Sequence, residues 1–154
     1  MQEYKIITTT EEYAAAADLF KEYAAWLNID LSFQSFEKEL AALKQMYNAA
    51  DGGIILCKED NDYIACVAIR RQQENIAELK RMYVQPLHQH KGIGKALLEH
   101  ALALAKTCGY TLIRLDTLNT MAPAMNLYKR NGFYEIPPYY FNPQQTAVYF
   151  ERKV

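Results

Sequence analysis

The 154-residue sequence predicts an α/β fold with a mixed, mostly antiparallel central sheet and helices on both faces. Segments with strand and helix patterns alternate along the chain in the order β-α-α-β-β-β-α-β-α-β-β. One strand–helix–strand unit, residues 76–118, implies a parallel strand pair with a right-handed crossover. The other strands follow one another closely enough to pair mainly antiparallel. Since no repeat or linker interrupts the pattern, we expect a single domain over residues 1–154.

The first half of the chain reads as a strand, two helices and a three-stranded meander. A strand is expected over residues 4–8, and Thr9 with Glu12 forms a capping box that begins a helix. Apolar residues at helical spacing predict a second helix over residues 35–49. β-branched runs separated by turn residues then predict the meander strands, at 54–58, 63–70 and 76–84.

The second half of the chain continues with two helices and three strands. A helix is expected from about Gly94 to Thr107, where Gly109 is a natural C-terminal stop. The next strand covers residues 111–118, and Pro123 suits the first turn of the helix that follows. That helix and the two closing strands are expected at 122–130, 133–136 and 147–152.

Composition excludes several classes of protein. The net charge of −1 argues against a nucleic-acid partner, which usually requires a strongly basic surface. No apolar run approaches the length of a bilayer span, and no signal-peptide pattern begins the chain, so we expect a cytoplasmic protein without membrane contact. The odd number of cysteines, all within apolar stretches, indicates reduced core thiols.

A glycine-containing loop between a strand and a helix is the most informative local pattern. It runs Gln89-His-Lys-Gly-Ile-Gly94, directly after the strand over residues 76–84. Glycine lets backbone approach a ligand closely, and the amides at a helix N-terminus favour a pyrophosphate. The spacing is not that of a P-loop, and Leu97 stands where a Rossmann loop has its third glycine.

The loop resembles the coenzyme A loop of the GNAT (GCN5-related) N-acetyltransferase family, whose pattern is Gln/Arg-x-x-Gly-x-Gly/Ala. Gln89, Gly92 and Gly94 match this pattern. Downstream, Ala124-Met-Asn-Leu-Tyr-Lys-Arg-Asn-Gly-Phe133 resembles the second family signature, Ala-x-x-Leu-Tyr-x-x-x-Gly-Phe. Both motifs lie in the expected structural context, at the usual separation.

The resemblance implies where acetyl-CoA would bind. Backbone amides of the loop would hold the pyrophosphate, and the preceding strand would pair with the pantetheine arm where a bulge splays it from its parallel neighbour. The adjacent charges Lys80 and Arg81 are compatible with such a bulge, or with an ordinary solvated edge. An asparagine usual in the family is displaced here, so either Thr117 or Asn119 would take its place. The expected cofactor-binding residues are Met82, Tyr83, Val84, Gln89, His90, Lys91, Gly92, Ile93, Gly94, Lys95 and Asn119.

The resemblance also implies two catalytic residues. Tyr128 corresponds to the general acid that protonates the departing thiolate, and the alternative is a tyrosine packed in the core. Glu78 is the expected base for the attacking amine, and the alternative is a salt bridge to Lys80 or Arg114. Asp116 and Glu135 are weaker candidates for the base.

The expected function is transfer of an acetyl group from acetyl-CoA to a primary amine of a small molecule, by direct attack in a ternary complex and without a metal. The alternatives are a non-catalytic module that binds acyl-CoA, and a loop that binds another phosphate compound. Residues 23–36 and the aromatic segment 134–149 are expected to frame the acceptor, unless these aromatics only pack the closing strands or a homodimer contact.

Overall fold

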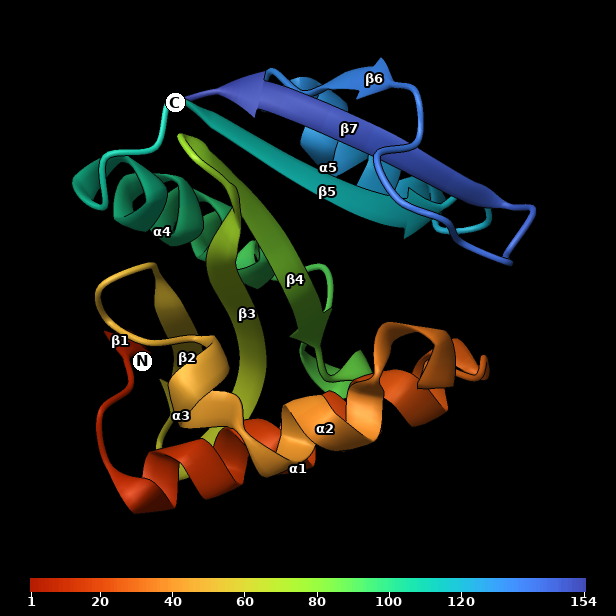
Figure 1. Ribbon diagram of the computed structural model, residues 1–154. Coiled ribbons are helices and arrows are strands. Elements are labelled where there is room, and N and C mark those ends of the chain that lie inside the picture. Colours follow the sequence, from red (N-terminus) through yellow and green to blue (C-terminus); the bar gives the residue numbers. More distant parts are fainter.

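The computed structural model describes residues 1–154, apart from the side chain of Phe33. Seven strands form one sheet in the order β1-β2-β3-β4-β5-β7-β6 (Figure 1). Only β4 and β5 are parallel, and every other neighbouring pair is antiparallel. The strands are β1 Gln2–Ile6, β2 Gly53–Glu59, β3 Asp62–Gln73, β4 Ile76–Val84, β5 Leu112–Leu118, β6 Tyr134–Ile136 and β7 Ala147–Lys153.

Helices cover both faces of the sheet, as the sequence predicts. One buried cluster joins the sheet to α4 and α5, and a second joins the opposite face to α1, α2 and α3. Single-turn 3₁₀ helices, η1 and η2, precede α2 and follow β4. The helices are α1 Thr10–Leu27, η1 Ser32–Gln34, α2 Phe36–Ala41, α3 Leu43–Met46, η2 Pro86–His88, α4 Ile93–Thr107 and α5 Ala122–Arg130.

The start of α1 confirms the predicted capping box. The Glu12 amide donates to Thr9 Oγ1 at 3.2 Å, and the Thr9 amide donates to Glu12 Oε1 at 2.9 Å. Lys5 Nζ lies 2.7 Å from the other oxygen, Glu12 Oε2. The hydrogen bond from Lys5 and those from backbone amides lower the pKa of Glu12 to about 2. The carboxylate therefore remains ionised and fixes the connection between β1 and α1.

The predicted continuous helix over residues 35–49 is wrong, because the segment breaks at Ala42. This residue has φ −135° and ψ 33°, and it separates α2 from α3. The Tyr47 hydroxyl donates to Glu39 Oε2 at 3.0 Å. In one straight helix these residues would be about 12 Å apart along the axis. Tertiary hydrogen bonding therefore overrides the high helix propensity of the segment.

The parallel strands β4 and β5 pair only at one end and then diverge (Figure 1). Their pairing covers residues 76–78 and 112–114, so residues 79–84 have no partner strand on the β5 side. Arg81 has a left-handed φ of +57°, and the register with β3 shifts beside it. This bulge places Lys80 and Arg81 on the same face of the sheet. The bulge and the splayed strands implied by the family resemblance are therefore present.

A buried ion pair fixes the bulge to α2. Arg81 donates through Nε to Glu39 Oε2 at 2.9 Å and through Nη2 to Glu39 Oε1 at 2.8 Å. The two side chains are only 3% and 1% exposed. The Phe36 ring lies 5.2 Å from the guanidinium. The pair thus connects the irregular part of β4 to the helices on that face.

We expect Arg81→Met to lower the free energy of unfolding by about 3–5 kcal/mol, because it leaves the Glu39 carboxylate buried without its partner. Chemical denaturation measures this loss. Arg71→Met is the matched control, since Arg71 pairs with Asp51 where the side chains are 49% and 35% exposed. Arg71→Met should lower the free energy of unfolding by less than about 1 kcal/mol. Equal losses in the two variants would contradict the account.

Candidate active site

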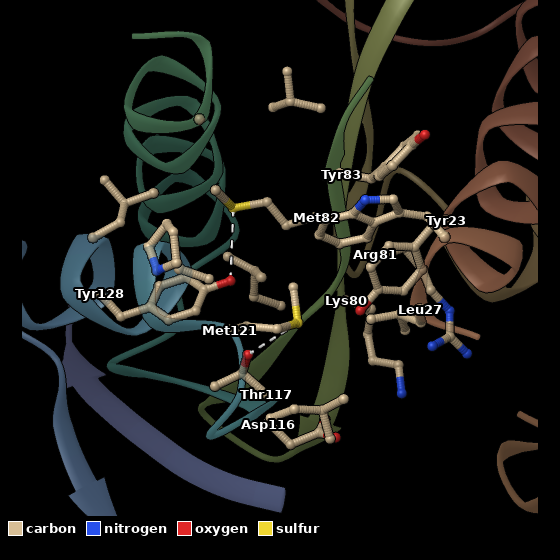
Figure 2. A pocket seen from close by; sticks show the side chains of 18 of the residues that line it. Tyr23, Leu27, Lys80, Arg81, Met82, Tyr83, Asp116, Thr117, Met121 and Tyr128 are labelled. Atoms are coloured by element: carbon tan, nitrogen blue, oxygen red, sulfur yellow. Dashed lines mark hydrogen bonds between the residues drawn. The ribbon is translucent and has the colours of Figure 1, made fainter. Parts of the chain in front are cut away.

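A pocket of about 640 Å³ lies where β4 and β5 diverge (Figure 2). Its walls come from α1 and the segment after it, β4, the loop before α4, β5, α5 and the segment before β7. Figure 2 shows Lys80 and Arg81 to one side of β4, and Tyr128 with Met121 to the other. Segments from both halves of the chain therefore meet around one cavity.

The β4 edge contributes three of the predicted cofactor residues to the wall. Met82, Tyr83 and Val84 all line the pocket. The Tyr83 ring also packs toward α1, 5.9 Å from Tyr23 and 5.8 Å from Trp26. Since this stretch of β4 lacks a partner strand on the β5 side, its edge is available to an extended ligand.

The loop before α4 presents a row of backbone amides. His90 and Gly92 both have left-handed φ values, +65° and +82°, and Gly92 is the N-cap of α4. Within the described part of the chain, none of the amides of residues 90–95 has a hydrogen-bond partner. The Gln89 side chain donates to Val84 O at 3.0 Å, which ties the loop to the end of β4.

The side chains of this loop divide between the pocket, the solvent and the core. Gln89, His90, Gly92, Gly94 and Lys95 line the pocket. Lys91 is exposed outside the lining, and Ile93 is buried in the core beneath α4. A ligand could therefore contact Lys91 only at the rim and Ile93 only through its backbone.

The end of β5 places Thr117, rather than Asn119, against the pocket. Thr117 is 9% exposed, lines the cavity and donates to Met121 Sδ at 3.9 Å. Asn119 is exposed outside the lining, and its amide donates to Thr146 O at 2.8 Å. A cofactor contact of Asn119 stays a prediction, and Thr117 is the better placed of the two residues.

Tyr128 projects from α5 into the pocket. It is 5% exposed, and its hydroxyl faces Met82 Sδ at 3.9 Å across the opening (Figure 2). Phe133 and Phe150 pack on its ring at 5.6 and 6.2 Å. Burial is the largest cause that raises the pKa of Tyr128 above that of an ordinary phenol. The hydroxyl therefore keeps its proton at neutral pH.

Glu78 lies outside the pocket lining, in a network of its own. Arg70 Nε and Nη2 both lie 2.9 Å from Oε1, and the Tyr139 hydroxyl donates to Oε2 at 2.8 Å. Burial alone would raise the pKa of Glu78, but Lys80, Arg70 and the Tyr139 hydrogen bond together lower it. Glu78 thus forms an ion pair, but with Arg70 rather than with the expected partners Lys80 or Arg114, which contact Gln34 and Glu151 instead. The role of Glu78 as base stays a prediction.

The two weaker candidates for the base differ sharply in position. Asp116 lines the pocket, and its Oδ2 accepts a hydrogen bond from the Tyr140 hydroxyl at 2.7 Å. Glu135 is exposed on β6, away from the lining. Of the three candidate carboxylates, Asp116 is thus the one that lines the cavity.

The aromatic segment before β7 contributes Asn142 and Gln144 to the pocket lining, but none of its aromatic residues. The rings of Tyr139, Tyr140 and Tyr149 pack at centroid distances of 5.3–5.7 Å, which agrees with a packing role. Their hydroxyls nevertheless reach polar groups near the cavity, since Tyr139 contacts Glu78 and Tyr140 contacts Asp116. Tyr140 also accepts a hydrogen bond from Gln34 at 3.1 Å. The segment therefore links elements from both ends of the chain beside the cavity.

Several polar residues that line the pocket were not individually predicted as site residues from the sequence. They come from several segments far apart in the sequence, and the tertiary structure brings them together. Their charges and hydrogen-bonding groups nonetheless determine what the cavity can hold. They are Gln34, Lys80, Thr120, Arg130, Asn142 and Gln144.

The model of the Acetyltransferase (GNAT) family matches residues 12–133 of the sequence. An uncharacterized N-acetyltransferase of Schizosaccharomyces pombe is 33% identical over 85% of this chain and 82% of its own length. A second one, of Dictyostelium discoideum, is 29% identical over 95% of this chain and 96% of that protein. The chain therefore belongs to the GNAT acetyltransferase family, and it is an acyltransferase.

A solved structure supports the same fold. The PaiA N-acetyltransferase of Thermoplasma acidophilum, determined in complex with coenzyme A, superposes with a TM-score of 0.76. The match covers 100% of this chain and 99% of that one, at 22% identity. The mixed sheet and its covering helices are thus those of the acyl-CoA N-acyltransferase fold.

The described residues include no candidate membrane span and no candidate metal site. No helix there combines the length and apolar character that a membrane crossing requires. No group of three or more His, Cys, Asp or Glu side chains in the same part of the chain has the arrangement of a metal site. A mechanism without a metal stays a prediction.

Proposed function

We propose that the protein is an N-acetyltransferase that moves an acetyl group from acetyl-CoA to a primary amine of a small molecule. The observation that carries this proposal is the continuity of one pocket. It connects the unpaired amides before α4, the unpaired edge of β4, the Tyr128 hydroxyl and the Asp116 carboxylate. At about 640 Å³, it has the size of small-molecule sites.

The donor site is proposed along α4 and β4. The amides of residues 90–95 suit a pyrophosphate, because they add to the positive end of the α4 dipole. Lys95 lines the same end of the pocket, and Lys91 lies nearby in the loop. Met82 and Val84 offer backbone groups to an amide-containing pantetheine arm. The structure of the Thermoplasma acidophilum relative with coenzyme A supports this choice of donor.

The chemistry is proposed to be direct attack in a ternary complex. The amine nitrogen attacks the thioester carbon, and a backbone amide near Met82 stabilises the oxyanion that forms. The carbon–sulfur bond then breaks, and Tyr128 donates its proton to the departing thiolate. The buried phenol suits this step because it stays protonated until a strong base forms beside it.

The amine also has to lose a proton, because a protonated amine has no lone pair for attack. Asp116 is the better placed acceptor of this proton, since it lines the pocket and its Oδ1 has no hydrogen-bond partner among the described residues. Glu78, which the family resemblance implies, would act through an intervening water, because its two oxygens already contact Arg70 and Tyr139.

The positions of the cysteines support direct attack rather than an acetyl-cysteine intermediate. None of the three lies among the residues that line the pocket. Cys66 is fully buried, and its thiol donates to Arg81 O at 3.2 Å. Burial raises the pKa of this thiol, which makes the thiolate nucleophile scarce.

The proposal is tested by incubating the protein with acetyl-CoA and a set of primary amines, and by following free coenzyme A thiol. Amine-dependent thiol release, with the acetylated amine identified by mass spectrometry, is the expected result. Acetyl-CoA binding without thiol release for any amine would instead indicate the non-catalytic binding module. Competition by ATP or NAD with coenzyme A would indicate a different phosphate ligand.

A further inference from the structure

Lys80 carries a buried charge that no ion pair neutralises. It is 6% exposed, and it lines the pocket. The other buried charged residues of the described structure, Glu12, Glu39, Glu78, Arg81 and Glu151, each lie in a salt bridge. Lys80 Nζ has one hydrogen bond, to Gln34 Oε1 at 3.2 Å, so two of its three donors have no protein partner.

The nearby cations cannot substitute for Lys80 in binding an anion. Arg81 is held in two hydrogen bonds by Glu39, and Arg70 is held by Glu78. The charge of Glu78 favours the protonated form of Lys80, but its oxygens are directed to Arg70 and Tyr139. Burial still lowers the pKa of Lys80 overall, which indicates an incompletely solvated charge.

A chain of three hydrogen bonds joins Lys80 to a second unpaired charge, Asp116. Lys80 donates to Gln34 at 3.2 Å, Gln34 donates to the Tyr140 hydroxyl at 3.1 Å, and Tyr140 donates to Asp116 at 2.7 Å. Asn142 also donates to the Tyr140 hydroxyl, at 3.3 Å. Lys80, Gln34, Asp116 and Asn142 all line the pocket, so its proposed acceptor end holds one cation and one anion linked by hydrogen bonds.

We propose that the acceptor is an amino-acid-like molecule, with its carboxylate bound by Lys80 and its amine directed to Asp116. This inference rests on the proposed acetyl transfer and specifies its substrate class. An amine alone would leave the Lys80 charge buried without a counterion, and a charge left in that state is costly. A carboxylate can accept both unused Lys80 donors, while the amine lies beside the group that takes its proton. The three linked hydrogen bonds connect the two binding groups within one pocket.

The test compares the twenty L-amino acids with their amides, which keep the amine and lose the carboxylate. Loss of the negative charge lowers the pKa of the amine, so intrinsic reactivity at neutral pH favours the amides. With wild-type protein, at least one amino acid should nevertheless have a kcat/KM about 10- to 100-fold above that of its amide, the size expected for a hydrogen-bonded ion pair.

Variants locate the source of this preference. Lys80→Met should abolish the preference for the amino acid while activity on the amide persists, and Lys80→Arg should restore part of it. Lys106→Met, on the exposed end of α4, removes an equal charge and should leave the preference unchanged. Equal use of acids and amides by the wild-type protein, or equal losses for both in Lys80→Met, would overturn the inference.

A binding measurement separates this inference from the proposed catalysis. The same acids and amides are titrated by calorimetry into protein saturated with coenzyme A, where no acetyl transfer can occur. Binding of an amino acid that is lost in its amide and in Lys80→Met supports the inference, even if no amine is acetylated. Absence of acid-selective binding overturns it, even if a carboxylate-free amine is acetylated rapidly.

Discussion

Replacing Tyr128 with Phe should lower kcat by about 10²- to 10⁴-fold, the usual contribution of a positioned proton donor. The ring would keep its packing against Phe133 and Phe150, so the fold and the affinity for acetyl-CoA should persist. Only the proton for the departing thiolate would be missing. Steady-state kinetics give kcat, and calorimetry gives the dissociation constant for acetyl-CoA.

Tyr134→Phe is the matched control for this experiment. Its hydroxyl donates to Glu151 Oε1 at 2.6 Å, but the residue is 46% exposed and lies outside the main pocket. Its kcat should equal that of the wild-type protein. Unchanged turnover in Tyr128→Phe would show that Tyr128 is a core tyrosine rather than the acid.

Replacing Asp116 with Asn should lower kcat/KM by about 10²- to 10⁴-fold, because the amide oxygen can still accept from Tyr140 but cannot take the amine proton. The residual rate should continue to rise with pH, since the variant depends on amine already deprotonated in solution. Initial rates measured across a pH series, with stability checked at each pH, test both expectations.

Glu78→Gln provides the comparison that distinguishes the two carboxylates. We expect Glu78→Gln to lower kcat/KM less than Asp116→Asn does, because the change mainly weakens contacts to Arg70 and Tyr139 outside the pocket. Lys80 and Arg70 keep the pKa of Glu78 low, so its carboxylate is ionised throughout the neutral pH range. Its titration should therefore cause no change of rate with pH in that range. A larger loss in Glu78→Gln than in Asp116→Asn would identify Glu78 as the base acting through water.

The fold was predictable because local signals and tertiary packing agree over most of the chain. The capping box at Thr9 and Pro123 in the first turn of α5 define helix starts by local chemistry alone. The break at Ala42 was not predictable in this way. It depends on Glu39, Arg81 and Tyr47, which meet only in the folded structure.

The candidate site, too, was predictable only where it depends on residues that are consecutive in the sequence. The donor loop was recognisable because its amides and glycines are consecutive in sequence, from Gln89 to Lys95. The acceptor side was outlined only as the ranges 23–36 and 134–149 with Asp116 as a weaker base candidate, because Gln34, Lys80, Asp116 and Tyr140 come from four separate segments that meet only in the folded structure. Glu78 shows the limit of inference from a motif, since the sequence places it on the correct strand but does not reveal Arg70 and Tyr139 on its carboxylate.

The most direct test of the central claim is calorimetric titration of acetyl-CoA into wild-type protein, Gly92→Asp and Gly109→Asp. Both glycines have left-handed φ values, +82° and +89°, and an added Cβ at either would meet no atom within 4 Å. The two substitutions therefore impose similar backbone strain, but only Gly92 lies in the proposed pyrophosphate site. We predict micromolar binding to the wild-type protein and to Gly109→Asp, and its loss in Gly92→Asp. No binding to the wild-type protein, or equal binding to both variants, would contradict the claim that acetyl-CoA is held at this loop.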